Sequence, residues 1–343
     1  MSASAQGLAG RRALGWTDLQ VSALAMGTMQ FGWLVSDVES MKILDAYVEA
    51  GGNFIQTANM YGADQNLMSY EKGKAHVGVT EDLIGRWMAS RGNRDQLVVG
   101  TKVRARMWDR PDGEGLGRRH VERAVEDSLR RLRTESIDLY TAHWPDPDTP
   151  IEETLGVFED LVKAGKVRYV GLSNFAAFGA LDITLDALKK GSSLRIAAEQ
   201  PRYSLVNRAE YEGHLQEVSL REEMGITPYS SLAGGFLTGK YRKDQPIPDS
   251  VRAGYASKLM TDQGWALIDV VEEVARTHDT TMSAVALAWV LAQPGITAPI
   301  VGANSIQQMA GWIPAAEMTL TPEEIERLAS SSWDASDMEF FDW

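Results

Sequence analysis

The sequence predicts an α/β fold, a (β/α)8 TIM barrel with extended loops at the C-terminal face of its strands. Short apolar runs alternate with longer amphipathic segments at a spacing of roughly forty residues, which is the rhythm of repeated βα units. Eight such runs are present, and 343 residues with 44% hydrophobic content suffice for one barrel. An open doubly wound sheet is the alternative fold.

The eight expected strands share an apolar character and short length. They are residues 21–26, 53–56, 97–101, 137–141, 167–172, 194–199, 226–230 and 298–301.

Helices are expected between these strands, and two are especially clear. A helix beginning near Arg118 has one apolar face, made by Val121, Ala124, Val125, Leu129 and Leu132. Another begins after Thr149-Pro150, has acidic residues in its first turn, and ends at Gly165.

The open-sheet alternative requires a glycine-rich turn between the first strand and the first helix. The segment 27–32, Gly-Thr-Met-Gln-Phe-Gly, has the wrong spacing for that turn. A closed barrel is therefore the better prediction.

Three long connections follow strand ends, at residues 60–80, 104–117 and 231–260, on the face where barrels place binding loops. We expect residues 1–343 to form a single barrel domain, with a flexible start at 1–12. The end, 321–343, is expected to be a short helix followed by an acidic tail.

Composition excludes several classes of protein. A formal charge of -13 disfavours binding to nucleic acid or anionic lipid, and the absence of cysteine excludes disulfides and thiolate metal sites. Residues 1–12 lack the apolar run of a signal peptide, and no segment is long and apolar enough to span a bilayer. These features predict a cytoplasmic protein with no membrane partner.

The expected chemistry converges at the ends of consecutive strands. Gln56, Lys102 and His143 lie at or just beyond the ends of strands two, three and four, and Tyr61 follows on the next loop. A tyrosine beside a lysine and a histidine can donate a proton to a carbonyl oxygen, since the ammonium lowers the tyrosine pKa. A metal-dependent hydrolase needs several ligands at strand ends, but only His143 of the five histidines lies at one, so no metal site is expected.

These residues lie in segments that resemble motifs of the aldo-keto reductase superfamily, in particular its bacterial NADP-dependent oxidoreductases. The segment 53–62, Asn-Phe-Ile-Gln-Thr-Ala-Asn-Met-Tyr-Gly, resembles the family's Asp-Thr-Ala-x-x-Tyr signature, and Thr101-Lys102 and His143-Trp144-Pro145-Asp146 resemble its lysine and histidine motifs. The segments 171–175, 199–201 and 229–240 resemble those that hold the nicotinamide and the pyrophosphate. The resemblance runs from about Leu14 to Thr321.

The resemblance implies hydride transfer between a nicotinamide cofactor and the carbonyl or hydroxyl of an aldehyde, ketone or sugar-like substrate. Tyr61 is then the general acid or base, Lys102 tunes it, and His143 positions the substrate oxygen. The implied cofactor-binding residues are Gly27, Thr28, Ser173, Asn174, Gln200, Tyr229, Ser230, Leu232, Gly234, Leu237, Gly239, Lys240, Gly302, Asn304 and Gln308.

Gln56 stands where the family has an aspartate that pairs with the lysine. Its amide oxygen can accept a hydrogen bond from Lys102, but the negative charge is lost, which disfavours the charged lysine. The resulting hypothesis is a slowed or altered reductase. Three explanations remain open: an engineered change, an adaptation to a substrate that brings its own acid, or a barrel that binds cofactor without turnover.

The segment 300–308 offers amides and a hydroxyl where many relatives have a cation for the adenosine 2′-phosphate. The resemblance therefore favours NADP(H) as the cofactor, and NAD(H) is the alternative. Arg208 or Lys240 is a candidate cation for the 2′-phosphate.

Three tryptophans on the loops after strands one, three and four are candidates for contact with the substrate. Trp33, Trp108 and Trp144 either form an apolar or sugar-stacking wall or simply seal the barrel top. The polar insertion at 63–80 is either a lid or a disordered loop. The alternative function is a cofactor-binding sensor or regulatory barrel with little or no turnover.

Overall fold

The computed structural model describes residues 7–62 and 77–335. The expectations for the first six residues, for most of the insertion at 63–80 and for the acidic end at 336–343 lie outside the described residues.

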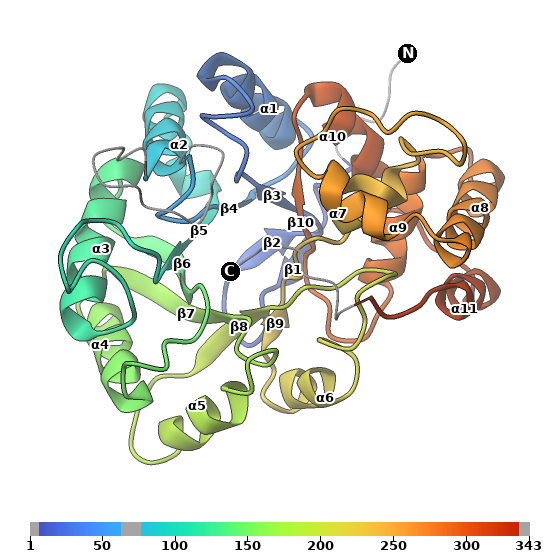
Figure 1. Cartoon of the computed structure of the whole chain (residues 1–343). Helices are drawn as coiled ribbons and strands as arrows, with labels where there is room; N and C mark the ends of the chain where they lie inside the picture. Colours follow the sequence, from blue (N-terminus) through green and yellow to red (C-terminus); the bar gives the residue numbers. More distant parts are fainter. Residues whose placement is uncertain (1–6, 63–76, 336–343) are drawn as a thin grey trace.

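Eight parallel strands form one sheet that curls around a central axis, with helices outside it (Figure 1). In spatial order they are β10 (Ile300–Gly302), β3 (Ala25–Gly27), β4 (Phe54–Gln56), β5 (Val98–Val103), β6 (Ile137–Ala142), β7 (Val167–Ser173), β8 (Ile196–Gln200) and β9 (Gly225–Ile226).

The ends of this sheet meet through backbone hydrogen bonds. The Thr297 amide donates to the Ile226 carbonyl and the Ile300 amide to the Pro228 carbonyl, each at 2.8 Å. The sheet is therefore closed, which confirms the (β/α)8 barrel and excludes the open sheet.

The first expected strand, at 21–26, is divided in two. Strand β1 (Arg11–Ala13) and strand β2 (Gln20–Ser22) form an antiparallel hairpin, and two residues separate β2 from β3. Leu14, Leu19 and Val21 of the hairpin region pack against barrel-interior residues such as Phe54. The hairpin therefore seals the N-terminal end of the barrel.

Eleven helices lie in the described part of the chain. They are α1 (Asp37–Glu49), α2 (Val79–Arg91), α3 (Arg118–Leu132), α4 (Ile151–Lys163), α5 (Leu181–Leu188), α6 (His214–Arg221), α7 (Ala253–Lys258), α8 (Asp262–Thr277), α9 (Met282–Leu291), α10 (Ile306–Trp312) and α11 (Pro322–Ser331). Short 3₁₀ helices occupy η1 (Arg94–Gln96), η2 (Ala233–Thr238) and η3 (Ile313–Ala316).

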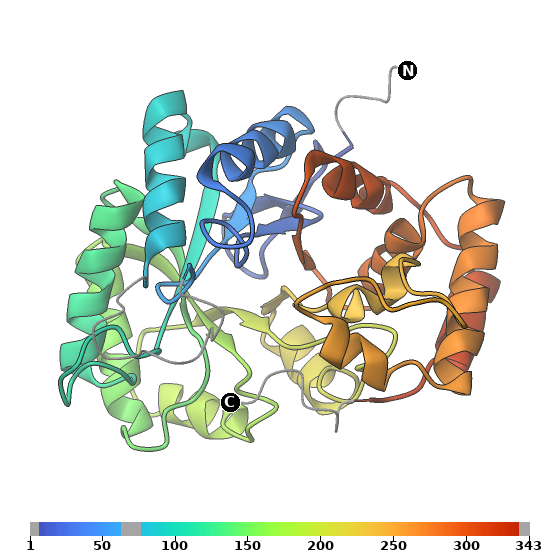
Figure 2. The ribbon, with the colours of Figure 1, turned by 45° about the horizontal axis from the view of Figure 1, so that its top comes forward.

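The two helices that the sequence predicts most clearly are confirmed as α3 and α4. The expected face of α3 is buried, and Gly165 follows α4 with a left-handed φ of 72°. The terminal helix α11 packs beside α8, where Arg327 and Glu273 form an ion pair (Figure 2). No helix among the described residues is both long and apolar enough to cross a membrane.

Candidate active site

A pocket of about 570 Å³ opens at the carboxyl ends of the strands, and we call it the first pocket. All four expected catalytic residues line it, namely Gln56, Tyr61, Lys102 and His143. So do most of the expected cofactor residues: Gly27, Thr28, Ser173, Asn174, Gln200, Tyr229, Ser230, Leu232, Gly234, Lys240, Gly302, Asn304 and Gln308.

Gln56, the last residue of β4, is buried and bonds across the barrel. Its Oε1 accepts a hydrogen bond of 3.0 Å from Nε2 of Gln200, at the end of β8. Its side chain lies over Gly100, where an added β-carbon would come within 2.3 Å of the Gln56 Nε2. Gly100 thus provides the room that a glutamine needs at this position.

Lys102 on β5 is buried and does not bond to Gln56. Its Nζ donates to the Thr57 carbonyl at 2.7 Å and lies 3.4 Å from the Tyr61 hydroxyl oxygen. Burial lowers the pKa of Lys102 to about 7, against the opposing effect of the Glu81 carboxylate. Lys102 is therefore a lysine that changes charge near neutral pH.

Glu81 is the carboxylate that acts on Lys102 from a distance. It is fully buried at the start of α2, where it accepts hydrogen bonds from Thr101 Oγ1 at 2.5 Å and from Arg131 Nε at 2.7 Å. Because Glu81 is already paired with Arg131, it supports the Lys102 ammonium only weakly.

Tyr61 and His143 meet edge to face, with ring centroids 6.0 Å apart. Burial raises the pKa of Tyr61, while the positive charge of Arg252 acts in the opposite direction. The pKa of His143 is well below its usual range because of burial and the charges of Lys102 and Arg104. The pocket therefore holds a protonated phenol beside a neutral imidazole at neutral pH.

The floor of the first pocket next to His143 is fixed by a chain of side-chain hydrogen bonds. Asn174 has a left-handed φ of 65°, and its Nδ2 donates to the His143 carbonyl at 2.9 Å. The Tyr229 hydroxyl donates to Asn174 Oδ1, and Ser173 Oγ donates to the Gln200 carbonyl, both at 2.9 Å. These residues are held in place before any ligand binds.

The far side of the pocket carries two cations. Lys240 lies 3.3 Å from the Ser250 hydroxyl, and Arg252 is within electrostatic reach of Tyr61. Sequence reasoning missed Arg252, because the basic residues of the long 231–260 loop form no pattern that singles it out. Arg208 does not line this pocket, since its guanidinium pairs with Glu212.

Four other expected site residues do not line the first pocket. Leu237 is fully buried in the hydrophobic core, and Gly239 lies against Met282 and Arg242. The Trp33 indole donates to the Met29 carbonyl at 2.7 Å, and Trp108 packs on His120 with a centroid distance of 4.8 Å. Of the three expected tryptophans, only Trp144 lines this pocket.

The lining of the first pocket fits a polar, extended ligand such as a nicotinamide dinucleotide. Five buried polar atoms of its lining have no hydrogen-bond partner among the described residues: Gln30 Oε1, Gln56 Nε2, His143 Nδ1, Ser231 Oγ and Trp312 Nε1. Buried polar atoms are rarely left unpaired, so these are positions where a ligand amide, hydroxyl or phosphate can bond.

Comparison with known proteins is consistent with this geometry. Residues 23–332 match the model of the aldo/keto reductase family. The chain belongs to this family. Aldo-keto reductases are oxidoreductases that use nicotinamide cofactors and act on small carbonyl compounds.

Three relatives of this aldo-keto reductase show how similar its sequence is to known proteins. The chain is 34% identical over 320 residues to the uncharacterized oxidoreductase YrpG of Bacillus subtilis, covering 92% of this chain and 93% of that protein. It is 32% identical to protein tas of Escherichia coli, covering 91% and 94%. It is also 30% identical to a putative voltage-gated potassium channel subunit beta of Schizosaccharomyces pombe, covering 92% and 91%.

Proposed function

We propose that this aldo-keto reductase reduces the carbonyl of an aldehyde, ketone or sugar-like compound, with Tyr61 as the proton donor and NADP(H) as the favoured cofactor. The single observation that carries the proposal is the 3.4 Å distance from Lys102 Nζ to the Tyr61 hydroxyl, in a pocket that also holds His143. A bound nicotinamide supplies the hydride.

Each residue of this group has a defined part. The Tyr61 hydroxyl carries a proton at neutral pH and releases it to the substrate oxygen as that oxygen gains negative charge. The Lys102 ammonium, when charged, stabilises the resulting phenolate. His143 is neutral and offers one ring N–H to orient the carbonyl oxygen.

Gln56 lowers the charge of Lys102 at neutral pH but leaves Lys102 in contact with Tyr61. No carboxylate of the described residues lies within ion-pair distance of Lys102, so the lysine loses charge near pH 7 rather than well above it. We therefore expect a reductase that is slowed at neutral and alkaline pH.

The test is single-turnover reduction of a model aldehyde, such as 4-nitrobenzaldehyde, by purified protein with NADPH. Tyr61→Phe should lower the rate by about a hundredfold or more, since general acid catalysis contributes that much. Gln56→Asp should raise the rate. An equal or lower rate in Gln56→Asp would refute the idea that the amide impairs catalysis.

The choice of cofactor is tested by titrating NADP⁺ and NAD⁺ against intrinsic tryptophan fluorescence. Lys240 is the exposed cation that lines the pocket, whereas Asn304 and Gln308 offer amides. Equal affinities for the two cofactors would refute a dedicated 2′-phosphate site.

A regulatory barrel is the second candidate function. It is favoured by the substitution at Gln56 and by the similarity to a putative channel subunit beta. This alternative predicts tight cofactor binding with negligible reduction of any aldehyde, and it predicts that Gln56→Asp does not create activity.

A further inference from the structure

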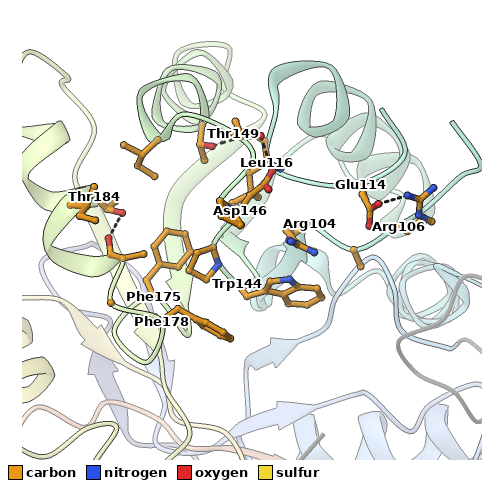
Figure 3. A pocket seen from close by; sticks show the side chains of 18 of the residues that line it. Arg104, Arg106, Glu114, Leu116, Trp144, Asp146, Thr149, Phe175, Phe178 and Thr184 are labelled. Carbon is orange, nitrogen blue, oxygen red and sulfur yellow. Dashed lines mark hydrogen bonds and ion pairs between the residues drawn. The ribbon is translucent and has the colours of Figure 1, made fainter. Parts of the chain in front are cut away.

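A second pocket, of about 940 Å³, lies beside the first pocket, and Figure 3 shows the side chains that line it. It lies among the loops that follow β5, β6 and β7. Met60 and Trp144 line both pockets, so the two pockets adjoin at these side chains. The second pocket is therefore the space next to a carbonyl that lies beside Tyr61, on the far side of Trp144.

One wall of the second pocket is apolar although it is open to solvent. The side chain of Phe178 is 58% exposed and that of Ile183 is 64% exposed, and both line the pocket. In Figure 3, Phe175 and Phe178 lie on one side of Trp144. Large exposed hydrophobic side chains that gather around one pocket mark a surface that binds apolar ligands.

Arg104 lies over the junction of the two pockets in a strained conformation. Its φ of 148° falls in the region that favours glycine, and its guanidinium lies 5.1 Å from the centre of the Trp144 ring. Its Nε is buried without a hydrogen-bond partner. Strain that persists at a pocket beside an unpaired donor is typical of a ligand-binding residue.

The acidic side chains that line this pocket bond elsewhere. Asp146 accepts hydrogen bonds of 2.7 Å from the Leu116 amide, on the loop after β5, and from Thr149 Oγ1, on its own loop, and these bonds fix its carboxylate. Glu114 forms an ion pair with Arg106, the other arginine of the pocket. Among the described residues, no carboxylate lies within ion-pair distance of Arg104.

We propose that the second pocket binds the body of the substrate, and that the substrate is an aromatic aldehyde or ketone carrying a carboxylate that pairs with Arg104. The aromatic body packs on Trp144 and Phe178, and the guanidinium offers the paired N–H donors that match a carboxylate. This inference rests on the proposed reductase function, because the carbonyl end of the molecule is placed at Tyr61.

The inference is tested by comparing acids with their neutral amides. The aldehydes are 4-formylbenzoate and 4′-formylbiphenyl-4-carboxylate, which carry the carboxylate at two distances, each paired with its carboxamide. For the native protein we expect at least one acid to have a KM roughly tenfold lower than its amide, with similar kcat, as one charge-assisted pair provides. Equal KM values within both pairs would overturn the proposal.

Two variants locate the effect. Arg104→Met should raise the KM of the preferred acid roughly tenfold and leave that of the amide unchanged. Arg106→Met is the matched control, because Arg106 lines the same pocket but is paired with Glu114. This variant should keep the lower KM for the acid than for its amide. A rise in KM for acid and amide alike in Arg104→Met would contradict a carboxylate contact.

Binding without turnover separates this inference from the proposed reaction. Calorimetric titration uses biphenyl-4-carboxylate, which has no aldehyde or ketone group to reduce. The native protein should bind this acid, and the Arg104→Met variant should not. Neither protein should bind biphenyl-4-carboxamide with comparable affinity. If these ligands behave so but no aldehyde is reduced, the reductase function fails and the anion site stands. If aldehydes are reduced without preference for acids, the reductase function stands and the anion site fails.

Discussion

Gln200 Nε2 donates a hydrogen bond of 3.0 Å to Gln56 Oε1, and this bond joins β8 to β4 across the barrel. The Gln56 side chain is directed toward Gln200 and does not bond to Lys102. Lys102 is left to bond with the Thr57 carbonyl and with Tyr61. Residue 56 therefore supports the side chain of Gln200 and does not pair with the lysine.

The first prediction concerns the pH dependence of reduction. The pKa of Lys102 is about 7, so its charged fraction falls as pH rises through neutrality, and kcat/KM for reduction should fall with it. Gln56→Asp places a negative charge near the ammonium, which raises the lysine pKa and moves the midpoint of this fall to higher pH. The control is Gln56→Asn, which has the shorter side chain without the charge. If Gln56→Asn moves the midpoint equally, side-chain length rather than charge is responsible.

The second prediction concerns the bond between Gln56 and Gln200. Gln56→Met keeps a similar volume but leaves the buried Gln200 Nε2 without its acceptor, so the free energy of unfolding should fall by about 1–3 kcal/mol. Guanidinium chloride unfolding measures this change. Gln307→Met replaces an exposed glutamine of the same pocket and should change the free energy by less than about 0.5 kcal/mol.

The third prediction concerns Lys102 and stability. The folded pKa of Lys102 is about 7 and the unfolded value is 10.5, so between these values the unfolded state binds more protons and stability rises with pH. Lys102→Met should therefore be more stable than the native protein, most clearly at or below pH 7, and the advantage should shrink toward pH 10. Lys190→Met, at an exposed lysine, should show no such trend. If the difference in free energy of unfolding between Lys102→Met and the native protein is constant across the pH range, folding does not lower the pKa of Lys102.

The fourth prediction concerns Glu199, the buried neighbour of Gln200. Burial raises its pKa to about 8, although the amides of Phe175 and Ala176 bond to it and favour the charged form. Because the unfolded value is 4.5, the unfolded state binds fewer protons between pH 4.5 and 8, and native stability falls as pH rises through this window.

Glu199→Gln removes this titration. Its stability relative to the native protein should increase through the window, by on the order of 1 kcal/mol per pH unit. The exposed Glu217→Gln is the control and should show no pH trend relative to the native protein. A flat difference for Glu199→Gln would show that the carboxyl is already ionised in the folded protein.

The fold and the centre of the site could be predicted because both follow from periodicity. Strands at a regular spacing place the residues at their ends on one face, which brings Gln56, Lys102 and His143 together without knowledge of any contact. Strand boundaries do not follow from periodicity, as the short β9 and the division at residues 21–26 show. These depend on loops whose geometry the periodicity does not define.

Partners across the barrel and conformations of loops could not be predicted. Gln56 and Gln200 lie on strands that are not neighbours, so no local rule pairs them. Arg104 and Arg252 are each one of several basic residues in a long loop, and only the folded loops bring them to the pockets. Trp33 and Trp108, like Trp144, follow the ends of strands in the sequence. In the fold, however, the Trp33 indole bonds to the Met29 carbonyl, and Trp108 bonds to Asp112 and packs on His120.

The seam that closes the barrel has a consequence for how ligands affect the whole fold. Strand β9 has only two residues, and its closure onto the segment leading into β10 depends on the amides of Thr297 and Ile300. The first pocket is lined by residues from both sides of this seam, Tyr229 on one side and Gly302 on the other. A ligand bound in this pocket would contact both sides of the seam and hold them together. Amide hydrogens at Thr297 and Ile300 should then exchange with solvent more slowly when the cofactor is bound, so that occupancy is reported by the rigidity of the barrel wall.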